Sequence, residues 1–364
     1  MLKKTEHPAA FTATAFSAFF LLAAAPALAQ DGGRVRIQGT DIPEETTPEY
    51  HDQSILLDYR EEMRKLVQSI SVYARQQRPN FLIISQNGLD LLAKRDISDE
   101  EKSSPARTYM QSIDGIIHDG VLFGEMEFGK PPSDTVTKEI LGLIELADSH
   151  GLKVMISDYA AEPGAIGNLY DRYGERGYIP FISSTLEMNV LPAVPSRPYN
   201  ENANSVVSIK DVRNYLYLSD SSSFGRQDEF ALKVHDTNYD LVAVDVFHRR
   251  LPLTRQAVET LKYKKIGAKR LVFALVDIGS AASYRYYWQP RWREGSPLWI
   301  SAPFIGDPDR YHVQYWSPEW KEIISGDPQS YIYGAIDQGY DGVILKGLDE
   351  YRYFEGGGEG QEEP

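Results

Sequence analysis

Short apolar runs recur along the chain beyond residue 53, and segments with helical apolar spacing separate many of them. Most runs end in an acid or an amide. Runs that are apolar on both faces are typical of buried parallel strands with helices packed on either side. The pattern predicts eight such strands and an α/β fold. The runs lie at residues 81–84, 113–117, 154–156, 178–182, 215–218, 241–244, 271–276 and 342–345.

Apolar residues at helical spacing predict helices between these strands. The clearest begin near residue 56, ending at Arg78-Pro79, and near 135–150, 254–264 and 329–338. Eight strand–helix units favour a closed (β/α)8 TIM-type barrel, whose active site lies at the carboxyl ends of its strands. An open doubly wound sheet is the alternative.

The first 29 residues have the pattern of an export signal. Lys3 and Lys4 precede an apolar stretch at 16–25, and Ala27-Leu28-Ala29 forms a small-x-small cleavage site. We therefore expect a periplasmic or secreted protein with no stable membrane insertion after cleavage, the alternative being an uncleaved anchor. The remaining chain divides into a flexible lead-in (30–53), a barrel (54–354) and a disordered, acidic, glycine-rich tail (355–364).

Composition and charge exclude several kinds of chemistry. The chain has 38 Lys and Arg against 52 Asp and Glu, a net charge of −14, so nucleic acid is an unfavourable partner. It has no cysteine, and its seven histidines lack metal-ligand spacing, so we expect no metal and no cofactor. No Walker loop, strand-linked dinucleotide motif or nucleophile elbow is found. Carboxylates at strand ends remain, and a pair of carboxylates is what glycoside hydrolysis requires.

All five tryptophans fall between residues 288 and 320, together with several tyrosines. Clustered aromatic rings on the loop face of a barrel suit stacking against sugar rings. The alternative is a small core of loop side chains packed over a helix. We expect the Trp288→Ala and Trp316→Ala substitutions to weaken glycan binding if the first interpretation holds.

Four segments resemble glycoside hydrolase family 114, at residues 239–245, 278–288, 313–320 and 339–345. More narrowly, they look like its branch of secreted bacterial and archaeal hydrolases, whose best-studied relatives are endo-α-1,4-polygalactosaminidases. Segments 85–88, 113–116 and 153–159 resemble further strand motifs of that branch. The resemblance implies a TIM barrel that cleaves an amino-sugar polysaccharide, containing galactosamine, without a metal.

The order of these motifs differs from the family. The strand at 215–218 resembles the family's first strand, whereas the strand ending in Ser85-Gln86-Asn87-Gly88 resembles its fifth. The chain therefore looks circularly permuted, with a new linker near residues 191–211. A closed barrel tolerates such a change because its first and last strands are neighbours.

The resemblance also suggests site residues. Asp119 matches the family's catalytic Glu, and Asp245 and Asp349 are the other candidate catalytic acids. The position of a further catalytic Asp is occupied by Lys346. The candidate substrate-binding residues are Gln86, Asn87, Asp158, Tyr159, Tyr284, Arg285, Trp288, Tyr315, Trp316 and Lys346.

Lys346 conflicts with the chemistry of the family, because a cation opposes an oxocarbenium-like transition state. We expect its ammonium to pair with Asp119, Asp245 or Asp349 and to keep that acid ionised, which would disable a proton donor. On this interpretation Lys346→Asp raises activity on de-N-acetylated galactosamine polymers, and the ligand is a cationic or amino-sugar glycan bound in an acidic cleft.

Three functions remain open from the sequence. The first is an active glycosidase that uses Asp119 with Asp245 or Asp349. The second is a catalytically weakened barrel that binds polysaccharide. The third is a structural or assembly component of the cell envelope.

Overall fold

The computed structural model describes residues 57–96, 99–124 and 128–356. The expected export signal and lead-in lie outside the described residues, as does the expected tail beyond Gly356. Glu355 is the last residue of helix α9 (Tyr351–Glu355), and its carboxylate accepts a hydrogen bond of 2.8 Å from Arg60. Helix α9 therefore ends one residue beyond the expected barrel boundary at 354.

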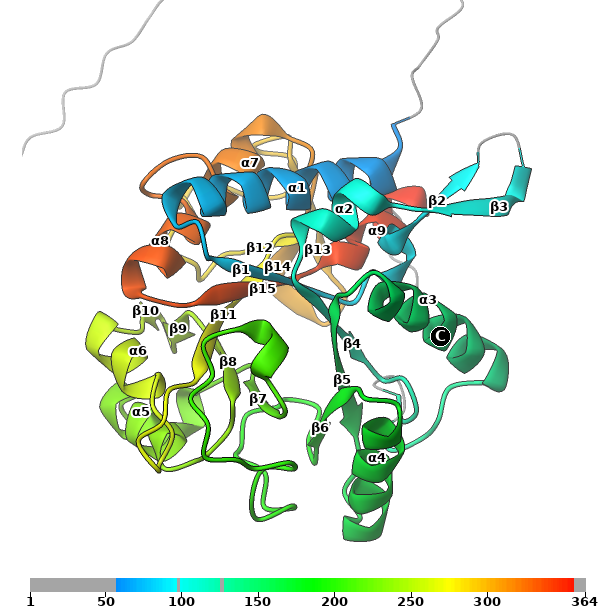
Figure 1. Cartoon of the computed structure of the whole chain (residues 1–364). Helices are drawn as coiled ribbons and strands as arrows, with labels where there is room; N and C mark the ends of the chain where they lie inside the picture. Colours follow the sequence, from blue (N-terminus) through cyan, green and yellow to red (C-terminus); the bar gives the residue numbers. More distant parts are fainter. Residues whose placement is uncertain (1–56, 97–98, 125–127, 357–364) are drawn as a thin grey trace, which may run out of the picture. The chain divides into compact units, whose positions relative to one another are not determined.

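Eight parallel strands form a nearly closed barrel (Figure 1). Their order in the sheet is β6-β5-β4-β1-β15-β11-β8-β7, so each strand neighbours the one that precedes or follows it in the sequence, with β1 beside β15. Strands β6 and β7 lie side by side, and the rings of Phe181 and Tyr215 are 5.7 Å apart across this junction. The predicted (β/α)8 barrel is confirmed, and this order has no switch point of an open doubly wound sheet. The strands are β1 (Leu82–Gln86), β4 (Gly115–Asp119), β5 (Lys153–Tyr159), β6 (Ile179–Ser183), β7 (Tyr215–Leu218), β8 (Leu241–Asp245), β11 (Leu271–Asp277) and β15 (Gly342–Lys346).

Helices cover the outside of this barrel. The longest is α1, which begins after Asp58, whose carboxylate accepts from the amide of Glu61, and which buries Met63, Leu66 and Ile70. Four expected helices correspond to α1, α3, α6 and α8. The helices other than α9 are α1 (Tyr59–Gln77), α2 (Arg107–Ser112), α3 (Asp134–Ser149), α4 (Pro163–Glu175), α5 (Gln227–His235), α6 (Arg255–Leu261), α7 (Pro318–Ile324) and α8 (Tyr331–Gln338).

The connection from β6 to β7 differs from the others because it contains no α-helix, only the short 3-10 helix η2 (Ile209–Asp211). It includes the segment predicted as a linker. Asp240 holds this connection in place. It accepts hydrogen bonds from the side chain of Asn202 and the amide of Arg213, and it forms an ion pair with Lys264. Both members of the ion pair are fully buried.

A second, three-stranded sheet lies between β11 and α7. It has the order β12-β14-β13 and is formed by β12 (Ser280–Ala282), β13 (Ile300–Phe304) and β14 (Asp307–Val313). The remaining described strands form two antiparallel hairpins. One pairs β2 (Ala93–Asp96) with β3 (Asp99–Pro105), and the other pairs β9 (Phe247–His248) with β10 (Leu251–Pro252). Among the described residues, no helix combines the length and the apolar character needed to cross a membrane.

Candidate functional site

A hydrogen-bonded layer of polar side chains fills the barrel at the carboxyl ends of its strands. Tyr217 of β7 donates its hydroxyl hydrogen to Oε1 of Gln86 over 2.7 Å, and Nε2 of Gln86 donates to Oδ2 of Asp119 over 2.6 Å. These contacts join β7, β1 and β4 through the barrel interior, and both Gln86 and Tyr217 are buried. The layer brings together two predicted site residues, Gln86 and Asp119, with a tyrosine that the sequence did not single out.

Asn87 also forms two hydrogen bonds with Asp119. Its side chain donates to Oδ2 over 3.2 Å and accepts from the Asp119 amide over 3.0 Å. Its backbone is left-handed, with φ 60°, a conformation that Asn tolerates better than most residues. The Gln-Asn motif at the end of β1 (Leu82–Gln86) therefore holds the carboxyl group of Asp119 in place.

Opposing effects set the pKa of the Asp119 carboxyl group. Burial raises its pKa above the ordinary value, although the hydrogen bond from Gln86 and the charge of Lys346 act in the opposite direction. Its Oδ1 is buried and, within the described part of the chain, has no partner in hydrogen-bond geometry, although the hydroxyl of Ser157 is close enough to lower the pKa of the carboxyl group. The sequence predicted that Lys346 would keep its partner ionised. At Asp119 burial acts against the charge of the lysine, and the pKa is raised rather than lowered.

Lys346 ends β15 and interacts with groups on other strands. Tyr217 and Asp277 raise its pKa while burial acts against them, and Asp119 also raises it. The ammonium is therefore charged at neutral pH. Among the described residues, no carboxylate oxygen lies within 4.0 Å of its Nζ atom. The charge of Asp119, one of the three expected partners, thus acts on Lys346, but the two side chains form no direct ion pair.

Asp277, at the end of β11, is a candidate acid that sequence reasoning missed. Its Oδ1 accepts from the amides of Gly279 and Ser280 over 3.1 and 2.9 Å, and its Oδ2 accepts from Arg310 over 2.8 Å. Burial favours the neutral form, but the charges of Arg310 and Lys346 prevail and lower its pKa. Asp277 is therefore ionised. Its position at a strand end was the available signal.

Asp245 and Arg285, both predicted site residues, bind each other. The guanidinium contacts the two carboxylate oxygens over 3.2 and 2.8 Å and stacks on Phe247 at 4.7 Å. Both atoms of the carboxylate are thus occupied by one cation. The expected pairing of Asp245 with Lys346 is replaced by this bidentate pair.

Asp349 is exposed in the 3-10 helix η4 (Leu348–Glu350), where its charge acts on Glu350 and Arg352. The neighbouring Glu350 is buried, and burial together with Asp277 and Asp349 raises its pKa well above the ordinary value. Its Oε1 lies 2.7 Å from Nδ1 of His312. This carboxyl–imidazole pair links η4 to β14 and was not visible in the sequence.

Asp158 and Tyr159, predicted to bind substrate, lie inside the protein. The carboxyl group of Asp158 accepts from three successive amides, 121–123, and from the hydroxyl of Tyr173. Burial raises its pKa to about 7 against these bonds. Asp158 therefore holds in place the loop that follows Asp119, and its effect on the site is exerted through that loop.

The predicted aromatic platform is largely packed within the protein. Trp288 stacks on Tyr311 at 5.1 Å, and Trp316 contacts Tyr59 and Phe354 at 5.1 and 4.7 Å. Tyr315 is buried, so the packing favours a small core for these rings. Two rings of the same stretch remain accessible, Tyr284 with 44% and Tyr286 with 52% of their surface exposed.

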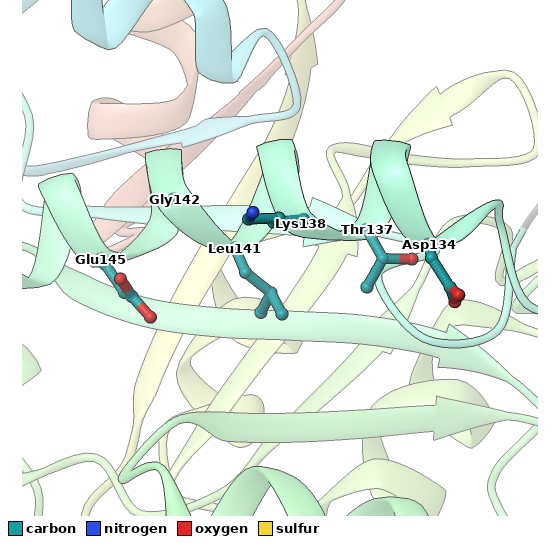
Figure 2. Close-up of a pocket in the computed structure, with 6 residues that line it drawn as sticks. All are labelled: Asp134, Thr137, Lys138, Leu141, Gly142 and Glu145. Atoms are coloured by element: carbon teal, nitrogen blue, oxygen red, sulfur yellow. The ribbon is translucent and has the colours of Figure 1, made fainter.

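Two open depressions lie on the outer helices, away from the strand ends. Figure 2 shows one along α3, lined by residues of that helix alone, among them Leu141 and Glu145. The other lies beside α5 and α6 and includes His235 and Tyr263. Neither contains a residue of the polar layer. Within the described part of the chain, no group of three or more acidic or histidine side chains could hold a metal ion.

Comparisons with known proteins give partial matches. No family model matches the chain. An uncharacterized protein of Thermotoga maritima is 26% identical over 151 residues, which are 42% of this chain and 45% of the relative. An uncharacterized protein of Methanocaldococcus jannaschii is 30% identical over 181 residues, 49% of each chain. An uncharacterized protein of Deinococcus radiodurans is 30% identical over 119 residues, 33% of this chain and 36% of the relative. The chain thus spans less than half the length of each relative.

One solved structure, described as Thermotoga maritima Cel5A in complex with cellobiose, is similar at a TM-score of 0.28 and 12% identity. The match covers 74% of this chain and 91% of that one. A similarity of this size adds nothing to the barrel that the strand order itself defines.

Proposed function

We propose that the protein is a glycoside hydrolase that acts on an amino-sugar polysaccharide at the carboxyl ends of the barrel strands. The observation that carries the proposal is Asp119, a buried carboxyl group with a raised pKa and one oxygen without a partner in hydrogen-bond geometry among the described residues. A carboxyl group whose pKa is raised is suited to protonate the oxygen of a leaving sugar.

A second carboxylate is needed as base or nucleophile. Asp277 fits this role because Arg310 and Lys346 keep it ionised, and because Lys346 acts on both Asp119 and Asp277. Asp245 and Asp349 remain the other candidates. Two carboxyl groups whose environments push their pKa values in opposite directions divide naturally into proton donor and anion.

The family resemblance supplies the amino-sugar substrate and a metal-free reaction. A circular permutation is part of this proposal. It rests on the order of the motifs along the sequence. The helix-free connection between β6 and β7 lies where the new linker is expected.

Export is also part of the proposal. An amino-sugar polysaccharide of the cell surface lies outside the cytoplasm, and the leader-like pattern at residues 1–29 supplies the route. We propose a periplasmic or secreted location, with polysaccharide as the partner.

The test is release of reducing ends from galactosamine polymers, both N-acetylated and de-N-acetylated. The parent is expected to release them, and Asp119→Asn to reduce the rate at least ~100-fold, as losses of a general acid typically do. Asp220→Asn is the matched control, because this exposed carboxylate follows β7 and bonds only locally to Ser222. An inactive parent, or an active Asp119→Asn variant, contradicts the proposal.

A polysaccharide-binding barrel without catalysis is the second candidate function. It is favoured by Lys346, a cation between two carboxyl groups that a glycosidase would use. Retention of polymer by the parent without any product selects this function. A parent that binds no glycan leaves the envelope component as the remaining interpretation.

A further inference from the structure

We infer that the barrel mouth binds a sugar carrying a carboxylate and that the ammonium of Lys346 is its ligand. This inference rests on the proposed function, because it assumes a glycan at the carboxyl ends of the strands. It narrows the substrate from an amino-sugar polysaccharide in general to an acidic one that contains uronic acid residues.

The pairing of charges at the mouth carries the inference. Arg310, Arg285 and Lys346 lie beside the acids at the strand ends, and the two arginines have a carboxylate each. Arg310 binds Asp277 over 2.8 Å, and Arg285 binds Asp245 over 2.8 Å at its closest oxygen. Lys346 has no such partner within 4.0 Å among the described residues, and the group that acts on it most strongly is Tyr217, a neutral phenol at physiological pH.

Lys346 therefore differs from Arg310 and Arg285, each of which has a paired carboxylate. Asp277 is already paired with Arg310, and burial acts against the ionised form of Asp119, so neither is a dedicated counterion of Lys346. A partly buried ammonium without a counterion binds a carboxylate well, because the low local dielectric strengthens the attraction.

A bound carboxylate also removes the conflict between Lys346 and glycoside chemistry. An isolated ammonium near the reacting sugar opposes the positive charge that develops at the anomeric carbon. An ion pair between Lys346 and a uronate cancels most of that field, so Asp119 and Asp277 can act as they would without the lysine. A purely cationic polymer would meet the ammonium of Lys346 as a like charge instead.

The experiment compares binding of three probes to the full protein by calorimetry. They are galacturonic acid oligomers, the same oligomers with their carboxylates reduced to alcohols, and de-N-acetylated galactosamine oligomers. We expect the parent to bind the carboxylated oligomer about 10-fold or more tightly than its reduced form, the size of one charge-assisted hydrogen bond. This preference should weaken as salt is added.

Variants assign the effect to Lys346. Lys346→Met should lose the preference for the carboxylated oligomer, Lys346→Arg should keep most of it, and Lys265→Met, an exposed lysine outside the mouth, should keep all of it. The salt dependence of the parent serves as the test if Lys346→Met does not fold.

Equal binding of the carboxylated and reduced oligomers, or tighter binding of the cationic one, overturns this inference and leaves the proposed function standing. If none of the three oligomers binds and no glycan is cleaved, the proposed function fails with it.

Discussion

Tyr217 and Gln86 are joined by a hydrogen bond of 2.7 Å although three strands separate β7 from β1 in either direction around the barrel. The bond therefore crosses the barrel interior. Since the Tyr217 hydroxyl donates to Oε1, the amide of Gln86 is oriented with Nε2 towards Asp119. Tyr217 on β7 thus orients the amide of Gln86 on β1, and this amide in turn holds Asp119 on β4.

The first prediction concerns the pH dependence of activity. Removing the Gln86 amide takes away a hydrogen bond that favours ionised Asp119, so Gln86→Leu should raise the pKa of Asp119 further. A proton donor works while it is protonated, so the basic limb of the pH profile of kcat/KM should move to higher pH.

The matched control is Tyr217→Phe, which removes the bond that orients the Gln86 amide but keeps the amide group that can donate to Asp119. Its basic limb should move less than that of Gln86→Leu. A basic limb that stays fixed in Gln86→Leu would show that Asp119 is not the titrating donor.

The strands could be predicted from the sequence because each is a local apolar run ending in polar residues. Once the barrel is assumed, the carboxyl ends meet on one face, and this places Gln86, Asn87, Asp119 and Lys346 together without any knowledge of side-chain contacts. The part of the site formed by the strands themselves was therefore accessible.

The partners of these residues were not accessible in the same way. Arg310 lies on β14, in a sheet inserted after β11, and its contact with Asp277 depends on the register of that sheet. Asp158 ends a strand like the other candidates, yet its side chain is taken up by loop amides. A strand-end position alone does not distinguish an acid that faces the ligand from one that holds a loop.

A second prediction compares two adjacent lysines. Lys264 is fully buried in its ion pair with Asp240, so Lys264→Met leaves an uncompensated buried carboxylate and should lower the free energy of unfolding by about 3–5 kcal/mol. Lys265 pairs with Asp236 at the surface, and 58% and 67% of these side chains are exposed. Lys265→Met should therefore change the free energy of unfolding by less than about 1 kcal/mol. Denaturant unfolding measures both, and equal losses would contradict the prediction.

A third prediction uses the pKa of about 7 that burial gives Asp158, against an ordinary value of 3.8. Between these values the folded protein retains a proton that the unfolded chain releases, so stability falls as pH rises through this window and levels off above it. The full loss amounts to about 4 kcal/mol for a shift of about three units.

The measurement is the free energy of unfolding of the parent and Asp158→Asn across that window. The parent should lose stability relative to the variant as pH rises from about 4 to about 8, because the amide does not titrate. Asp220→Asn, which alters an exposed carboxylate, should follow the parent. Parallel curves for the parent and Asp158→Asn would rule out a raised pKa.

The fourth prediction separates the rings that can reach a sugar from those that support the fold. Trp316 packs against Tyr59 and Phe354, so Trp316→Ala should cost about 2–4 kcal/mol of stability, below the value for a fully buried ring. Tyr284 is 44% exposed, and its ring lies 5.5 Å from the guanidinium of Arg285. Tyr284→Ala should change stability by less than about 1 kcal/mol.

Binding should show the opposite order. Loss of one stacking ring should weaken binding of a galacturonic acid oligomer about 3- to 10-fold in Tyr284→Ala. Trp316→Ala, compared at a temperature where it is folded, should bind like the parent, because its ring is occupied by protein contacts. Calorimetric titration of both variants, with thermal unfolding in parallel, measures the two effects separately. If Trp316→Ala loses affinity while Tyr284→Ala keeps it, the platform predicted from the tryptophans of the sequence is the correct one, and the exposed tyrosines are not part of the site.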